Sequence, residues 1–252
     1  MRFETILHEQ TDRIARITLA RAASGNRINE RMASEVREVC DSVRRDEGVW
    51  VVVIAGAGGT FCLGTDPAAL SDQKALARLR VASSVAGVEQ PVIAALNGDA
   101  FDQGLELALA CDIRIASTEA RFGLTQVERG LMPWDGGTQR LPRLVGRGRA
   151  MEWILAPRIA DAGEGLEAGL VNEVVDGSDV LRRAHEVASA IARHGPIAAR
   201  YLKEATQRGL DGTLEHGLRL EADLNFILQS TEDRAEGIRS FLERREPRYT
   251  GE

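Results

Sequence analysis

The sequence has few cysteines and no long apolar run. Its three cysteines, Cys40, Cys62 and Cys111, lack the Cys-x-x-Cys spacing of zinc sites, and their odd number does not suggest a disulfide framework. No apolar stretch approaches the ~20 residues that a membrane-spanning helix needs, and the acidic N-terminal segment lacks the apolar core of a signal peptide. These features predict a cytoplasmic protein with reduced cysteines, no metal site and no membrane contact.

Aromatic residues and positive charge are also scarce. Aromatic residues make up 4% of the chain, and 32 basic residues against 38 acidic ones give a net charge of −6. No basic stripe interleaved with aromatic side chains is present, so we expect no nucleic-acid partner. Local basic residues or helix N-termini can still surround the phosphates of a polyanionic ligand. A Ser-His or Cys-His nucleophile is not indicated, because no motif described below contains any of the four histidines, His8, His185, His194 and His216.

The hydrophobic pattern predicts an α/β crossover fold, because strands alternate with helices along the first two thirds of the chain. The continuous β-branched run at 49–55 is typical of a central strand that is buried on both faces. The other expected strands are 14–19, 91–96, 112–116 and 170–175, and the expected helices are 30–44, 75–88 and 104–110.

The last third of the chain is mainly helical in its pattern. Ser230 with Asp233 resembles a capping box that opens a final helix, which would end before Pro247. No linker or repeat is found. We therefore expect an α/β core at 1–195 and a helical region at 196–252 that belongs to the same functional unit.

The glycine-rich segment Gly56-Ala57-Gly58-Gly59 follows an expected strand, where such segments can bind a dinucleotide pyrophosphate. The dinucleotide pattern would need Gly or Ala at the position of Phe61. It would also need an acidic residue at a strand end about twenty residues further on, and neither is present. A plain turn is the better interpretation.

Two further segments suggest backbone N–H groups close to a carboxylate. Gly64 could direct the N–H of Thr65 outward, although Asp66 as a helix N-cap explains the same segment. If a helix begins near Gln103, then Glu106 lies one turn along it, beside the exposed N–H groups of the helix start. An acidic residue in a first helical turn is also favoured by the helix dipole alone, so spacing leaves both interpretations open.

Four segments together resemble the crotonase (enoyl-CoA hydratase/isomerase) superfamily. They are TFCLGTD, QPVIAALNGDAFDQGLELALACD, FGLTQVERGLMPWDGGTQRLPRLVG and STEDRAEGIRSFLERREP, and similar phrases follow one another in that family. The similarity extends from about Ile14 to Pro247. It implies a spiral of ββα units with a C-terminal helical region, assembled as a homotrimer or a dimer of trimers. It also implies an acyl-CoA thioester as the substrate and no permanently bound cofactor.

The resemblance assigns roles to several residues. The backbone N–H groups of Thr65 and Gln103 match the oxyanion hole, and Glu106 matches one of the two catalytic glutamates of the hydratases. Gln126 stands at the position of the second glutamate, and an amide cannot act as a general acid near neutral pH. Asp135 could be a substitute acid, or it could cap the next helix.

A further departure is Asp102-Gln103-Gly104, which stands where the family has three glycines. Either the backbone here avoids positive φ, or the two side chains reshape the pocket. The resemblance also suggests contacts to CoA or to the acyl group, although an arginine in a terminal helix is equally explained as a solvated face. The candidates for these contacts are Asn26, Arg27, Asp66, Trp134, Lys203 and Arg245.

The function expected from these features is hydration of a conjugated enoyl-CoA or cyclic dienoyl-CoA double bond through an enolate. The alternatives are an enoyl-CoA isomerase, a hydrolase of a ring or carbon–carbon bond in a CoA ester, and a catalytically weak acyl-CoA-binding subunit.

Overall fold

The larger of two sheets forms the centre of the computed structural model, which describes residues 3–70 and 73–252. Its strand order is β1-β2-β3-β5-β7-β10, and all neighbours are parallel except the β1–β2 hairpin. The α/β crossover fold expected from the sequence is therefore confirmed. The strands are β1 (Ile6–Thr11), β2 (Ile14–Leu19), β3 (Val51–Gly56), β5 (Val92–Leu96), β7 (Ile113–Ser117) and β10 (Glu173–Val175).

A second sheet is built from four strands of two or three residues each. Three of them directly follow long strands of the first sheet, so β3–β4, β5–β6 and β7–β8 repeat the same step and produce a spiral. These segments are too short to show an alternating pattern, and neither they nor β1 were expected from the sequence. The strands are β4 (Thr60–Cys62), β6 (Asp99–Phe101), β8 (Arg121–Gly123) and β9 (Ala160–Asp161).

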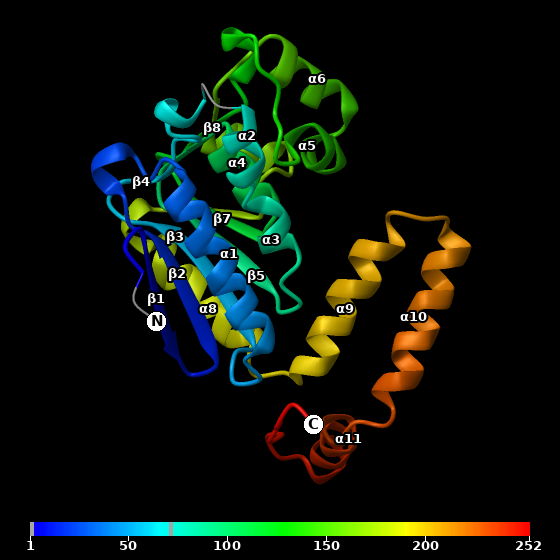
Figure 1. Cartoon of the computed structure of the whole chain (residues 1–252). Helices are drawn as coiled ribbons and strands as arrows, with labels where there is room; N and C mark the ends of the chain where they lie inside the picture. The colour runs from blue at the N-terminus through cyan, green and yellow to red at the C-terminus, as the bar shows by residue number, and fades with distance from the viewer. Residues whose placement is uncertain (1–2, 71–72) are drawn as a thin grey trace.

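The central strand β3 is buried along its whole length, as its run of β-branched residues predicts. Val52 and Ile54 face the core that includes α1 (Glu30–Arg45), while Val51 and Val53 face the core that includes α8 (Val180–Ile191). Figure 1 shows these two helices on the two sides of the larger sheet. The alternation of side chains along one strand thus supplies both layers of the core.

The helix expected at 75–88 is divided into α2 (Gln73–Arg78) and α3 (Ala82–Ala86). A side chain from a distant part of the chain caps the start of α3, as described below. The helix expected at 104–110 is α4 (Gln103–Leu109). The next helices along the chain are α5 (Gly137–Val145), α6 (Arg147–Leu155) and α7 (Ala162–Glu167).

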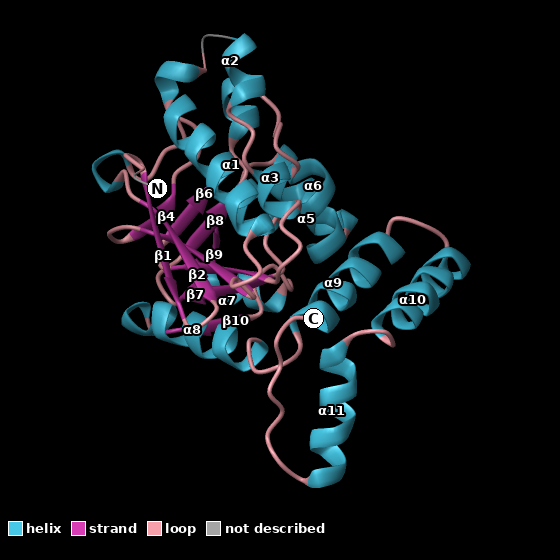
Figure 2. Ribbon diagram, turned by 60° about the horizontal axis from the view of Figure 1, so that its bottom comes forward, coloured by secondary structure: helices cyan, strands magenta, loops and turns pink. Residues whose placement is uncertain are grey.

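Three helices follow α8, namely α9 (Pro196–Gly209), α10 (Leu214–Leu228) and α11 (Glu232–Glu243). Figures 1 and 2 show α9 and α10 as a hairpin that extends away from the strands. Many large apolar side chains on these helices are exposed, including Phe226 at 75% and Phe241 at 80%. Within residues 3–70 and 73–252, no helix is long and apolar enough to cross a membrane.

The N-cap of α11 is Thr231, whose hydroxyl oxygen accepts a hydrogen bond from the N–H of Arg234 at 3.2 Å. The capping box expected from Ser230 is therefore wrong by one residue. Ser230 instead donates a hydrogen bond to the carbonyl of Ile227, at the end of α10.

Candidate active site

Glu106 is fully buried in the first turn of α4. Its Oε1 accepts hydrogen bonds from the N–H groups of Asp135 at 2.8 Å and Gly137 at 2.7 Å. Burial raises the pKa of Glu106 to about 7, although these N–H groups act in the opposite direction. Near neutral pH this carboxyl group can therefore both accept and donate a proton.

Gln126 lies beside the other oxygen of this carboxylate. Its Nε2 donates to Glu106 Oε2 at 3.3 Å, and its Oε1 is buried without a partner in the described part of the chain. The amide can orient a polar group at this point, but it cannot supply a proton.

Asp135 is buried, and its carboxylate is occupied by three donors. Oδ2 accepts from the N–H groups of Val81 at 2.8 Å and Ala82 at 3.1 Å, and from Gln103 Nε2 at 3.1 Å. Asp135 therefore caps α3, and the expectation that it caps the next helix is wrong, because Gly136 occupies the N-cap of α5. Its role as a substitute acid stays a prediction, which these three bonds disfavour.

The backbones of Thr65 and Gln103 meet beside Gly64, whose φ is 93°. A Cβ placed on Gly64 would lie 3.5 Å from the Gln103 nitrogen and 3.0 Å from the Cβ of Asp102. Neither the Thr65 N–H nor the Gln103 N–H donates a hydrogen bond to any residue that the structure describes. Two neighbouring backbone donors are therefore available to a ligand.

The altered glycine triplet keeps the left-handed backbone at its first position, where Asp102 has a φ of 48°. The sequence-based alternative that the backbone avoids positive φ is therefore wrong. Asp102 Oδ1 accepts from the N–H of Thr125 at 2.7 Å, and Oδ2 pairs with Arg129. Neither Thr125 nor Arg129 was expected from the sequence as a partner of Asp102. A partly buried aspartate needs hydrogen-bond donors or a positive charge close to its carboxylate. The local sequence does not indicate which residues supply them.

A cleft of about 380 Å³ adjoins this region, although Gln103, Glu106 and Gln126 are not among the residues that line it. Thr65 and Asp102 line it on one side, while Leu131 and Trp134 contribute apolar surface. Arg27 also lines the cleft, and its guanidinium donates to the carbonyl of Leu63 at 2.6 Å. The cleft therefore offers both polar and apolar contacts to a ligand.

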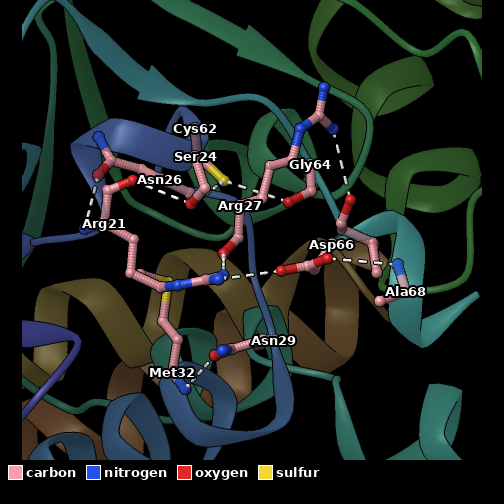
Figure 3. Close-up of polar contacts among 11 residues, drawn as sticks. Arg21, Ser24, Asn26, Arg27, Asn29, Met32, Cys62, Gly64, Asp66 and Ala68 are labelled. Atoms are coloured by element: carbon pink, nitrogen blue, oxygen red, sulfur yellow. Dashed lines mark hydrogen bonds and ion pairs between the residues drawn. The ribbon is translucent and has the colours of Figure 1, made fainter.

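The remaining candidate residues make contacts within the chain. Asn26 is buried and holds the carbonyls of Ala57 and Thr60, and Asp66 pairs with Arg21 at 3.0 Å (Figure 3). Asp66 still adjoins the cleft, because Thr65 and Pro67 on either side of it are lining residues.

The two basic candidates of the C-terminal region lie outside the cleft lining. Lys203 Nζ contacts Asp112 at 2.7 Å and the carbonyl of Gln90 at 3.0 Å, which fastens α9 to the core. Arg245 forms ion pairs with Glu236 and Glu243. Their predicted contacts with CoA remain predictions. Across residues 3–70 and 73–252, no group of three or more His, Cys, Asp or Glu side chains could hold a metal ion.

Comparisons with known proteins agree with this geometry. A model of the enoyl-CoA hydratase/isomerase family matches residues 9–252. The chain is 38% identical over 250 residues to (E)-benzylidenesuccinyl-CoA hydratase of Thauera aromatica. This match covers 96% of this chain and 98% of that protein. It is 34% identical over 257 residues to crotonyl-CoA hydratase of Syntrophomonas wolfei, with 99% of each chain covered.

Among solved structures, the chain resembles an enoyl-CoA hydratase from Bacillus anthracis with a TM-score of 0.96. The two are 38% identical, and the match covers 99% of this chain and 100% of the other. The fold and these relatives define an enzyme of the hydratase-like lyase class, within a family that also contains isomerases. The chain belongs to the enoyl-CoA hydratase/isomerase family of the crotonase superfamily.

Proposed function

We propose that this enzyme adds water across a conjugated double bond of an enoyl-CoA or a cyclic dienoyl-CoA. The observation that carries the proposal is the buried carboxyl group of Glu106, with a pKa of about 7, in the same region as the Thr65 and Gln103 N–H groups, which donate to no residue that the structure describes. CoA enters as the thioester of the substrate, and the proposal requires no permanently bound cofactor.

The two backbone donors would form the oxyanion hole. The N–H groups of Thr65 and Gln103 would bind the thioester oxygen, on which negative charge accumulates when the enolate forms. Removal of one such donor typically costs about 3 kcal/mol of transition-state stabilisation. The start of α4 adds its own positive field at the same point.

Glu106 would carry out both proton transfers of the reaction. Its carboxylate takes a proton from water while the water oxygen bonds to Cβ and the π electrons move to the thioester oxygen. The resulting carboxylic acid then gives that proton to Cα, which restores both the thioester carbonyl and the carboxylate. Gln126 would orient the water, since its amide lies 3.3 Å from Glu106 Oε2 and has an unpaired oxygen.

A second candidate reaction is double-bond isomerisation, which a single carboxyl group can carry out by moving one proton. Glu106 would then take a proton from Cγ and return it to Cα. The cleft serves either substrate, and Trp134 gives it a broad apolar surface for a ring or another bulky group. Ring or carbon–carbon hydrolysis and a weakly catalytic acyl-CoA-binding subunit remain further alternatives.

We further propose that the chain assembles as a homotrimer or a dimer of trimers. The exposed apolar side chains on α9, α10 and α11 form a surface that water solvates poorly, as Leu202 at 70% exposure and Phe241 at 80% illustrate. A neighbouring subunit that covers them would also bring its own basic residues close to this chain.

The test is to incubate the protein with crotonyl-CoA and with a cyclic dienoyl-CoA, and to follow the enoyl absorbance and the product mass. A gain of one water that Glu106→Gln abolishes and Glu167→Gln preserves would support hydration. Glu167 is a suitable control because it is exposed and carries the same chemical change. A shifted double bond without a change in mass would support isomerisation. Binding without any turnover would contradict both reactions.

A further inference from the structure

Gln103 has a buried side chain, at the position of the middle glycine in the glycine triplet that is typical of the crotonase superfamily. Its Oε1 accepts a hydrogen bond from Thr65 Oγ1 at 2.6 Å. Its Nε2 donates to the carbonyl of Leu79 at 2.6 Å and to Asp135 Oδ2 at 3.1 Å. Both ends of the amide are therefore engaged.

The chemistry of the partners fixes the orientation of this amide. The Leu79 carbonyl and the Asp135 carboxylate can only accept hydrogen bonds, so the NH₂ group must face them. The amide oxygen then points to Thr65, whose hydroxyl acts as the donor. A flipped amide would place its oxygen against these two acceptor oxygens, and such a contact is repulsive and costly in a buried site.

The consequence concerns the two backbone N–H groups of the proposed oxyanion hole. They belong to Thr65 and Gln103, and the side chains of these same two residues are hydrogen-bonded to each other. Thr65 follows Gly64, which has a φ of 93° and lacks the steric restraint of a Cβ. The carbonyl of the Gly64–Thr65 peptide group accepts from the N–H of Ile28 at 2.8 Å, and the link from the Thr65 side chain adds a restraint on the N–H side of the same group.

The same amide also reaches the turn that holds the catalytic carboxyl group. Asp135 accepts from Gln103 through its side chain and donates to Glu106 Oε1 through its backbone N–H at 2.8 Å. Hydrogen bonds thus connect four residues from three separate segments, namely Thr65, then Gln103 and Glu106 of α4, and Asp135.

We propose that Gln103 is a positioning residue, whose side chain fixes the two oxyanion donors relative to each other and to the turn that holds Glu106. This inference rests on the proposed function, since it concerns the same oxyanion hole. Its effect should be specific to the enolate, because the uncharged thioester gains far less from well-placed donors.

Two substitutions remove the link from opposite ends. Thr65→Val deletes the hydroxyl with little change of shape, and Gln103→Met deletes the amide. We expect each to lower kcat about tenfold and to change KM less than about twofold. The double variant should be no slower than Gln103→Met, because that change already removes the bond to Thr65 together with the bonds to Leu79 and Asp135. Thr65→Ser keeps the hydroxyl and should recover most of the loss, and Gln10→Met on the exposed strand β1 is the matched control.

A binding measurement separates this inference from the proposed reaction. Acetoacetyl-CoA ionises to a stable enolate, whereas butyryl-CoA does not. Thr65→Val and Gln103→Met should each weaken binding of acetoacetyl-CoA about tenfold and leave binding of butyryl-CoA within about twofold. Thermal unfolding of each variant would be measured under the conditions of the binding assay. If Gln103→Met is unstable, the comparison of Thr65→Val with Thr65→Ser still tests the link.

The outcomes distinguish the two proposals. Enolate-selective loss in the variants supports the positioning role even if the wild type hydrates no substrate, in which case the proposed reaction alone fails. Equal weakening for both ligands, additive effects in the double variant, or unchanged binding would overturn the positioning role, whatever the wild type turns over. A wild type that does not prefer acetoacetyl-CoA to butyryl-CoA would overturn it as well.

Discussion

The raised pKa of Glu106 makes a quantitative prediction for the variant Glu106→Gln. At low pH the carboxyl group is protonated in both the folded and the unfolded chain, so its ionisation does not change the free energy of unfolding. Between pH 4.5 and about 7 the unfolded chain releases the proton and the folded chain keeps it, so the free energy of unfolding falls as pH rises. Above pH 7 the wild type bears a penalty of about 3 kcal/mol, since one pKa unit corresponds to about 1.4 kcal/mol.

The substitution should remove this penalty with little other disturbance. The oxygen of the introduced amide can still accept from the N–H groups of Asp135 and Gly137, and its NH₂ group can donate to the unpaired Oε1 of Gln126 once that amide rotates. We expect the free energy of unfolding of Glu106→Gln, relative to the wild type, to increase by roughly 2–3 kcal/mol between pH 5 and pH 8.

The assay is urea unfolding of both proteins at several pH values and one fixed protein concentration, with Glu167→Gln as the control whose difference from the wild type should not vary with pH. In the wild type, the rate of hydration should rise with pH and reach half its maximum near pH 7, because the base must be ionised. A pH-independent stability difference, or a rate profile with its midpoint near 4.5, would refute the reasoning.

Three further predictions concern the neighbours of this carboxyl group and the outer helices. Gln126→Glu places a proton donor within 3.3 Å of Glu106, and kcat for hydration of crotonyl-CoA should rise at least about tenfold; an unchanged kcat would show that protonation of Cα is not limiting. Asp135→Asn should lower kcat less than about fivefold, because its amide oxygen can still accept the hydrogen bonds at α3; a loss of a hundredfold or more would identify Asp135 as the substitute acid. If the chain assembles as proposed, Phe241→Asp should give smaller species than the wild type in light scattering, and an unchanged mass would exclude this residue from the proposed interface.

Much of the fold could be predicted because the information is local. The strand at 49–55 is a continuous run of buried β-branched residues, and it was found within two residues of β3. The position of Glu106 in a first helical turn also followed from local spacing. The short strands of the second sheet could not be predicted, because two or three residues define no period.

The contacts that organise the site are not local. The bond from Thr65 to Gln103 spans 38 positions, and those from Val81 and Ala82 to Asp135 span 54 and 53. The sequence shows that Asp135 has a carboxylate that can cap a helix. It does not show whether that helix is the next one along the chain, α5, or the distant helix α3. The choice between them depends on how the turn of Asp135 packs against the start of α3, which only the folded chain determines.

The replacement of a glutamate by Gln126 is consistent with one carboxyl group performing both proton transfers. Oε1 of Glu106 already accepts two backbone N–H groups, so Oε2 is the oxygen that gains and loses the proton. An amide can donate to Oε2 when it is ionised and, after rotation, accept from it when it is protonated. A second carboxyl group at this distance would instead hold a proton of its own, because two adjacent carboxylates do not ionise together, and would supply a separate acid. Gln126 therefore suits a site in which Glu106 must spend part of the cycle in each state, and a pKa near 7 gives both states comparable populations at neutral pH.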